Sequence, residues 1–270
     1  METSLERIAE LERANYAATR PSAQVTPGLE VTLRPDCILT SSTVFPTRDS
    51  NHACLLQASA ETADDLIAEV TAFFRAQELP VAVYLSPACT PDDLSQRLLV
   101  RGFKRQPKKE TWMVLEDLPH YDMPSLASGV AVRTIAPSEA HVFAKVFMAA
   151  FDMPGDFAPL MAHLLEPSAA LANVHHYLAF VQEEPVGTCS LLRSGRFGVL
   201  GSAGVLPAYR GRGVATNLAV RAAIEAREHG VDTLMLQTAA DTWLEDFLRI
   251  TGFRRAFTRS PYTLDYDATG

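Results

Sequence analysis

The segment with the clearest chemical potential is Tyr209-Arg-Gly-Arg-Gly-Val-Ala215, which lies between a run typical of a strand and a run typical of a helix. Two glycines let the backbone turn sharply and approach a ligand closely, because no side chain stands in the way. The first N–H groups of a helix have no partner within the helix, and they carry the positive end of its dipole. Such a turn can hold a pyrophosphate, with Arg210 and Arg212 adding positive charge nearby.

The same segment has a simpler interpretation, which is a tight turn between strand and helix whose arginines are solvated. It is not a P-loop, because no Gly-Lys-Ser/Thr follows the glycines. Its glycine spacing also differs from that of a dinucleotide-binding fingerprint. Taken alone, the segment leaves both interpretations open.

The elements around this segment alternate between strand and helix. The helix that follows it has one face rich in alanine and leucine and stops at Gly230, a natural C-terminal position. The turn Glu183-Glu-Pro185 between two β-rich runs predicts a hairpin. The predicted strands cover 130–135, 176–181, 186–192, 197–205, 233–237 and a final strand pair over 253–266. The predicted helices cover 137–151, 157–165, the stretch between Ala215 and Gly230, and 241–250.

The two halves of the chain correspond when residue numbers differ by about 150, without a gap over roughly fifty residues. Leu94 to Phe103 lies opposite Leu244 to Phe253, and both stretches end in Gly-Phe. A two-fold repeat with so long a period indicates two domains rather than a solenoid. We therefore expect a first domain over 1–122, a linker over 123–129 and a second domain over 130–270.

The glycine segment resembles the acetyl-CoA loop of the GCN5-related N-acetyltransferases (the GNAT superfamily), whose pattern is Gln/Arg-x-x-Gly-x-Gly/Ala. Here the pattern reads Arg210-Gly-Arg-Gly213-Val-Ala215. A second family hallmark, a helix that ends in Gly-Phe before the last strands, is matched by Leu244 to Phe253. The resemblance spans about 130–266. It implies an α/β fold of two tandem GNAT-like domains, the first one degenerate, each with a central, mostly antiparallel twisted sheet flanked by helices.

The resemblance also implies an enzyme that transfers an acetyl group from acetyl-CoA to the amine of a small molecule or peptide, without a metal. The pyrophosphate would bind backbone N–H groups of the glycine segment, and the pantetheine arm would lie along a bulged strand edge. The backbone N–H of Val205 would polarise the thioester carbonyl. Asp241 stands where the family often has an Asn that donates a hydrogen bond to the pantetheine arm. An ionised Asp has no proton to donate, so it cannot make that contact. The implied cofactor-binding residues are Ala203, Gly204, Val205, Arg210, Gly211, Arg212, Gly213, Val214, Ala215, Thr216 and Asp241.

Two groups that usually assist the reaction in this family are missing. Leu248 stands where many members have a Tyr that protonates the departing thiolate, and the strand 197–204 contains no carboxylate to act as a base. Tyr262 is the candidate substitute for the acid. Catalysis could instead rest on proximity and thioester polarisation, with the amine losing its proton through water. The alternative function is an acyl-CoA-binding sensor or interaction protein that does no chemistry.

The first half carries no copy of the glycine segment. The residues opposite it are Ala60-Glu-Thr-Ala-Asp-Asp65, with neither glycine nor arginine and with three carboxylates at the start of a helix. We expect these acids to cap the helix and to repel a pyrophosphate. The first half should therefore keep a similar fold, bind no CoA, and serve as a scaffold or as one wall of the acceptor cleft.

The composition argues against several other classes. A net charge of −8 disfavours nucleic acid as a partner. No run approaches the roughly 18 apolar residues that a membrane span needs, and the N-terminus lacks the apolar core of a secretion signal. Four cysteines without metal-ligand spacing predict reduced, buried thiols in a cytoplasmic protein. Nothing in the sequence identifies the acceptor or the acyl chain length, and the oligomeric state is open between monomer and homodimer.

Overall fold

In the computed structural model, which describes residues 3–265, the helices and strands follow an order that occurs twice along the chain. In the first half, β3 (His52–Cys54) leads through α2 (Ala63–Arg75) to β4 (Val81–Leu85), and β3 and β4 are parallel. In the second half, β10 (Phe197–Val205) leads through α6 (Val214–Glu228) to β11 (Thr233–Ala239), and β10 and β11 are also parallel. The order and direction of these elements agree with the predicted duplication.

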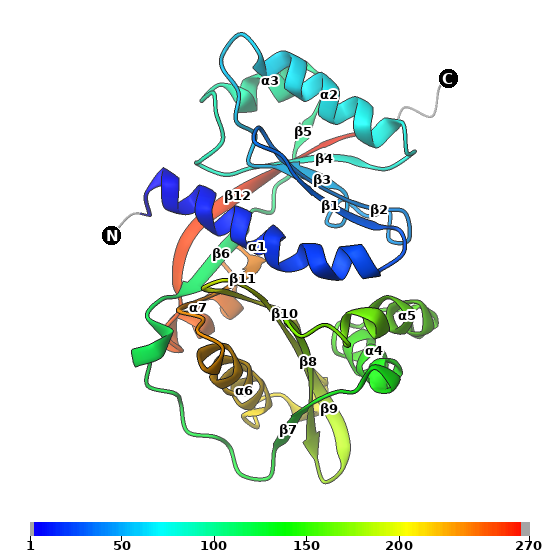
Figure 1. Ribbon diagram of the computed structural model, residues 1–270, viewed down its shortest axis with the longest axis vertical. Helices are drawn as coiled ribbons and strands as arrows, with labels where there is room; N and C mark the ends of the chain where they lie inside the picture. Colours follow the sequence, from blue (N-terminus) through cyan, green and yellow to red (C-terminus); the bar gives the residue numbers. More distant parts are fainter. Residues whose placement is uncertain (1–2, 266–270) are drawn as a thin grey trace. The chain divides into compact units, whose positions relative to one another are not determined.

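The other elements extend this pattern on both sides of the two β–α–β units (Figure 1). In the first half they are α1 (Leu5–Val25), β1 (Leu29–Leu33), β2 (Ile38–Ser42), α3 (Leu94–Val100), β5 (Lys104–Arg105) and β6 (Glu110–Leu115). In the second half they are β7 (Ala131–Thr134), α4 (Ala140–Ala150), α5 (Ala158–Ser168), β8 (Val174–Val181), β9 (Glu184–Ser194), α7 (Trp243–Ile250) and β12 (Arg254–Leu264). Short 3-10 helices cover Leu118–His120, Pro137–Glu139, Gly155–Phe157 and Pro207–Tyr209.

Mixed sheets flanked by helices confirm the predicted α/β class. The strand predicted over 197–205 is found there as β10, and the helix after the glycine segment is α6. The final strand pair predicted over 253–266 is wrong, because Arg254–Leu264 forms the single strand β12. That run contains no glycine or asparagine that would close a tight hairpin turn. Tyr266, at the end of the predicted pair, lies outside the described residues.

The chain forms two compact units that are not contiguous in sequence. Among the described residues, unit 1 contains 3–24, 28–113 and 237–265, and unit 2 contains 25–27 and 114–236. The last strand belongs to unit 1 because β12 pairs antiparallel with β4, from Ser260 opposite Leu85 to Leu264 opposite Val81. The predicted domain boundaries at 122 and 130 refer to the two copies of the sequence repeat and not to these compact units. They stay a prediction.

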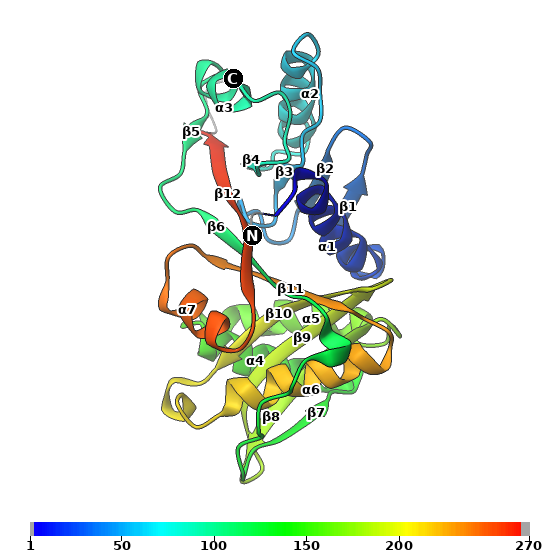
Figure 2. The same ribbon diagram turned by 90° about the vertical axis from the view of Figure 1, so that its left-hand side faces the viewer.

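Unit 2 has a sheet in the order β11-β10-β9-β8-β7, in which only the β10–β11 pair is parallel. Helix α6 covers one face of this sheet, and α4 and α5 cover the other (Figures 1 and 2). Gly187 on β9 permits a close approach of α6, since a Cβ there would lie 2.9 Å from Val214 and 3.1 Å from Leu218. The first turn of α6 is therefore pressed onto the sheet.

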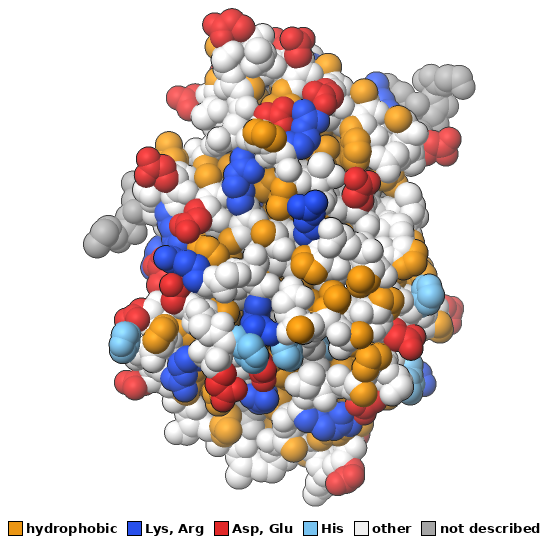
Figure 3. Space-filling model, viewed as in Figure 1, with side chains coloured by type: hydrophobic (Ala, Val, Ile, Leu, Met, Phe, Trp, Pro, Cys, Tyr) orange, Lys and Arg blue, Asp and Glu red, His pale blue; other side chains and the backbone are white. Residues whose placement is uncertain are grey.

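The surface carries charges of both signs. On the face in Figure 3, acidic and basic side chains are interspersed rather than separated into patches. No helix within residues 3–265 is both long and apolar enough to cross a bilayer. In the same part of the chain, no three His, Cys, Asp or Glu side chains gather in a way that could bind a metal ion.

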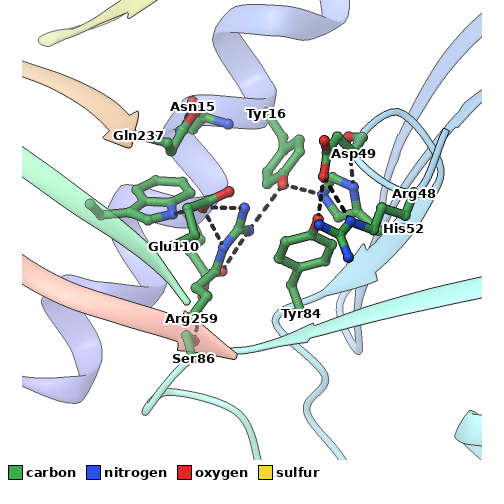
Figure 4. A network of polar contacts seen from close by, with 12 residues as sticks. Asn15, Tyr16, Arg48, Asp49, His52, Tyr84, Ser86, Glu110, Gln237 and Arg259 are labelled. Carbon is green, nitrogen blue, oxygen red and sulfur yellow. Dashed lines mark hydrogen bonds and ion pairs between the residues drawn. The ribbon is translucent and has the colours of Figure 1, made fainter. Parts of the chain in front are cut away.

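The two faces of the sheet in unit 1 have different environments, one apolar and one polar. Side chains alternate along β4, because successive residues of a strand point to opposite faces. Val81 and Val83 join the apolar core beneath α2 and α3. Tyr84 and Ser86 belong instead to a buried polar network with α1 (Figure 4).

The centre of this network is Arg259 on β12, which is 2% exposed. Its guanidinium donates to Glu110 at 2.9 Å and to Glu12 at 3.2 Å. It also lies between two aromatic rings, 4.9 Å from the centroid of Tyr84 and 4.8 Å from that of Trp112. Arg259 thus fixes the last strand of the chain against α1 and β6 through charge and cation–π contacts.

The network also fixes the tautomer of His52. Tyr16 accepts a hydrogen bond from Arg259 at 3.0 Å, so its own proton is directed to Nε2 of His52, 2.6 Å away. Nδ1 of His52 then carries the proton and donates to the carbonyl of Asp49 at 3.1 Å. Burial, reinforced by the nearby Arg259, lowers the pKa of His52 to about 3. His52 is therefore neutral in the folded protein.

This neutral histidine should make unit 1 sensitive to acid. An unfolded histidine binds a proton near pH 6.5, whereas folded His52 does not until about pH 3, so stability is full above pH 6.5 and is lost as the pH falls toward 3. Between pH 7 and pH 5, His52→Gln should lose about 2 kcal/mol less unfolding free energy than the wild type. Urea unfolding followed by tryptophan fluorescence measures this, since both tryptophans, Trp112 and Trp243, lie in unit 1. The exposed His120 provides the control His120→Gln, and equal losses in wild type and His52→Gln would contradict the assignment.

Candidate functional site

The head of α6 leaves a row of backbone donors without partners. Gly211 and Gly213 have φ of +75° and +79°, in the left-handed region, and Gly213 is the N-cap. The first backbone bond of the helix runs from Asn217 N–H to the carbonyl of Gly213, at 2.9 Å. Among the described residues, none accepts a hydrogen bond from the N–H groups of Gly211 to Thr216. This is the geometry that the sequence predicted for binding an anion.

Two contacts fix this conformation from a distant part of the chain. A Cβ on Gly213 would lie 2.4 Å from the Cβ of Ala127, so the predicted linker presses directly on the turn. The side-chain oxygen of Asn217 accepts from the N–H of Ala127 at 2.9 Å, and its amide donates to the carbonyls of Ala127 at 3.0 Å and Val130 at 3.1 Å. This role of Asn217 was not predicted from the sequence. The feature that could have indicated it is a single amide side chain on the apolar inner face of the helix.

The two arginines of the segment have different environments. Arg210 turns back into unit 2, where its guanidinium donates to the carbonyls of Val205 at 3.1 Å and Ala150 at 2.9 Å. Arg210 therefore ties the turn to the ends of β10 and α4. Arg212 is exposed and lies 5.2 Å from the ring centroid of Tyr209. Both side chains are exposed, but the Arg210 guanidinium is engaged by two carbonyls, so Arg212 is the one left to add charge beside the unpartnered N–H groups.

Strand β10 is bulged just before the turn. Its register against β9 shifts between Gly201 and Gly204, and Ser202 within the shift has φ of +49°. The hydroxyl of Thr188 donates to the carbonyl of Ser202 at 2.8 Å and holds the bulge in place. The parallel register of β10 with β11 ends at Val199, so the remainder of β10 extends beyond it. Ala203 to Val205, which the resemblance implies as the residues that bind the pantetheine arm, lie on this strand edge.

The remaining predicted site residues belong to unit 1, whereas the glycine segment belongs to unit 2. Tyr262 on β12 is 2% exposed, and its hydroxyl lies 2.7 Å from that of Ser95. Asp241 accepts a hydrogen bond from Arg255 at 2.7 Å, and its own N–H donates to Glu245. Leu248, at the position of the family's usual Tyr, is buried in α7.

The counterpart of the site in unit 1 lacks the open geometry. The N–H of Ala63 at the head of α2 donates to the carbonyl of Ser59 at 3.0 Å. The expected acid cap is not the one found, because Thr62 is the N-cap and makes no side-chain cap bond. Asp64 pairs instead with Arg97 at 3.1 Å and Arg101 at 2.9 Å on the α3 side. Asp64 of this turn therefore serves contacts between α2 and α3.

A bulged strand followed by a helix head with unpartnered donors, within a mixed α/β sheet, is a geometry that suits an extended anionic ligand. Residues 144–253 match the profile of the acetyltransferase (GNAT) family. Residues 144–253 therefore carry a GNAT domain, and the resemblance seen in the sequence is confirmed for this segment.

Solved structures share the fold across nearly the whole chain. A GCN5-related N-acetyltransferase from Kribbella flavida is 15% identical with a TM-score of 0.66, and the match covers 94% of this chain and 97% of that one. A GCN5-related N-acetyltransferase from Sphaerobacter thermophilus is also 15% identical, with a TM-score of 0.60 and coverages of 97% and 94%. A tandem GNAT protein from the clavulanic acid biosynthesis pathway is 13% identical, with a TM-score of 0.60 and coverages of 88% and 83%. At these identities the likeness concerns the fold. No curated protein matches the sequence.

The role of Asn217 can be tested through stability. Asn217→Ala leaves a buried N–H and two carbonyls without partners, which should lower the unfolding free energy of unit 2 by about 2–3 kcal/mol. Hydrogen exchange of the α6 amides measures the loss. Asn173→Ala is the matched control, because Asn173 is half-buried and its amide donates one bond, to the carbonyl of Arg193 at 3.2 Å. Equal effects of the two substitutions would show that Asn217 does not hold the turn.

Proposed function

We propose that this chain transfers an acetyl group from acetyl-CoA to an amine, and that unit 2 carries the site. The observation that supports this most directly is the row of N–H groups from Gly211 to Thr216, which have no acceptor among the described residues. They stand at the head of a 15-residue helix, inside the segment that matches the family. Acetyl-CoA is the co-substrate of this family, and its pyrophosphate is the kind of anion that such donors bind.

The residues present fit this co-substrate. A Cβ at Gly211 would meet no atom within 4 Å, so a ligand can approach the backbone there. Gly211 to Thr216 would hold the pyrophosphate, with Arg212 adding charge. Ala203 and Gly204 would pair with the pantetheine arm, and the N–H of Val205 would polarise the thioester carbonyl.

The reaction needs few protein groups. The lone pair of a neutral amine attacks the thioester carbonyl carbon, the C–S bond breaks, and the nitrogen loses a proton as the thiolate gains one. Bound orientation can lower such a barrier by several kcal/mol. We leave Tyr262 out of the proposed catalytic set, because its hydroxyl is buried beside Ser95, and likewise Asp241, whose carboxylate is engaged by Arg255. Water is then the proton carrier.

Ala215→Asp tests the pyrophosphate site without threatening the fold. Ala215 is exposed in the first helical turn, where an acid interacts favourably with the helix dipole, so the ligand-free Tm should be unchanged or slightly higher. The carboxylate would stand beside the bound phosphates, and the Kd for acetyl-CoA should rise by about tenfold or more. Calorimetric titration measures it. Ala172→Asp makes the same change at an exposed loop position of unit 2 and should leave the Kd unaltered. If Ala215→Asp binds like the wild type, the site is misplaced.

The same titration tests unit 1. We propose that its turn at Ala60 to Asp65 binds no CoA, since the N–H of Ala63 is already bonded and Asp65 adds negative charge. The wild type should bind one acetyl-CoA per chain, and Asp65→Ala should also bind one. A stoichiometry of two would refute the proposal for unit 1. Free thiol released from acetyl-CoA in the presence of amines separates the enzyme from a sensor that binds acyl-CoA without reaction.

A further inference from the structure

The end of α4 lies directly against the bulged part of β10. A Cβ on Gly204 would lie 2.8 Å from Cε2 of Phe151 and 2.9 Å from Cβ of Ala150. Arg210 donates to the carbonyl of Ala150 and so ties the same point of α4 to the glycine turn. Phe151 is therefore the first large side chain next to the strand segment that we assign to the thioester.

The chain turns sharply at the end of α4. Asp152 has φ of +53°, and the N–H of Met153 donates to the carbonyl of Met148 at 2.9 Å, which ends the helix in a left-handed turn. Phe151 is supported from behind by Phe147, with ring centroids 4.8 Å apart. The positions of Phe151 and Met153 are thus set by the helix end.

This helix end carries an exposed apolar surface. Phe151, Met153 and Phe157 are 49%, 41% and 46% exposed, although they fall within seven consecutive residues. Scattered apolar side chains are normal on a protein surface, but a contiguous group marks a binding site more often. Figure 3 shows hydrophobic side chains gathered over α4 and α5.

An open cavity of about 380 Å³ continues this surface between α4 and α5. Met153 lines it together with Met148, Ala158 and Pro159, so its wall is apolar. Its volume lies in the range of small-molecule sites.

The charged groups at this cavity are all potential cations. His141 and Lys145 flank it, and the eight lining residues include no carboxylate. Within the described residues, the Lys145 ammonium makes no hydrogen bond or ion pair. A second ammonium that entered the cavity would meet the positive charge of Lys145, because the exposed carboxylates of Asp152 and Asp156 lie in the neighbouring turn, outside the cavity lining.

We propose that the acceptor is a primary amine with a single positive charge and an apolar body, such as an arylalkylamine, and that Phe151 and Met153 determine this specificity. This rests on the proposed function. The amine nitrogen lies beside Gly204 and Val205, and the apolar body lies on Phe151 and Met153 and enters the cavity. Polyamines and aminoglycosides are disfavoured by Lys145 and His141.

Three amines of similar basicity test this in the acetyl-CoA reaction with the full chain. They are 2-phenylethylamine, the polar monoamine 2-(2-aminoethoxy)ethanol, and 1,4-diaminobutane. The value of kcat/KM, measured by thiol release, should be at least about tenfold higher for 2-phenylethylamine than for the other two. Equal values would overturn the inference and leave the proposed function standing.

Two substitutions probe the surface itself. Phe151→Ser should lower kcat/KM for 2-phenylethylamine about tenfold through KM, and binding of one acetyl-CoA per chain would show that the fold is intact. Lys145→Glu should raise kcat/KM for 1,4-diaminobutane about two- to fivefold, as expected for one exposed charge pair. Leu99→Ser, at a residue 44% exposed on α3 of unit 1, is the matched control and should change neither value.

The outcomes separate the two proposals. If acetyl-CoA binds but no amine releases thiol, a thermal shift with 2-phenylethylamine on the acetyl-CoA-saturated protein decides the matter. A shift that Phe151→Ser abolishes supports the specificity, and no shift overturns it. If Phe151→Ser and Lys145→Glu leave the preference between amines unaltered, the inference is also overturned. Failure to bind acetyl-CoA would remove the proposed function and the inference together.

Discussion

The left-handed conformation of Gly213 is the constraint on which the site in unit 2 depends. With φ of +79° and Ala127 pressed against its Cα, this position accepts only a residue without a side chain. That conformation starts α6 with no side chain over its first turn. The N–H groups that every helix leaves unpaired at its start therefore remain available. Asn217 maintains this arrangement, because its side chain holds Ala127 in place through two hydrogen bonds.

Unit 1 shows what the same architecture becomes without that constraint. Its β3–α2–β4 unit has the same order and direction as β10–α6–β11, but its helix starts at Ala63, whose N–H is already bonded and which is followed by two aspartates. The opposite face of its sheet holds Arg259 between Glu12 and Glu110. A buried ion pair adds little net stability, but removing one partner leaves an uncompensated charge, so such a network strongly favours one arrangement. Unit 1 is thus built around a closed polar network rather than an open backbone turn.

Helix α4 links the two ends of the site in unit 2. Its last residues receive a hydrogen bond from Arg210 of the glycine turn and pack against Gly204 of the bulged strand. One short stretch of chain therefore touches the turn that would hold the phosphates and the strand that would hold the thioester. The conformation of the turn and the position of the apolar surface at Phe151 are set by the same contacts. If the two proposals hold, binding of the donor and selection of the acceptor are properties of one packed region.

The sequence alone determined what depends on neighbouring residues. Local glycine placement and hydrophobic periodicity predicted the turn from Arg210 to Ala215, the strand at 197–205 and the helix after it. The family resemblance also rests on residues close together in the sequence. Only the tertiary structure decided which distant groups meet. It paired β12 with β4, turned Arg210 toward Ala150, and placed Ala127 under Gly213. Strand pairing and close packing join residues far apart in the chain, and no local pattern encodes which partner a strand or a side chain will find.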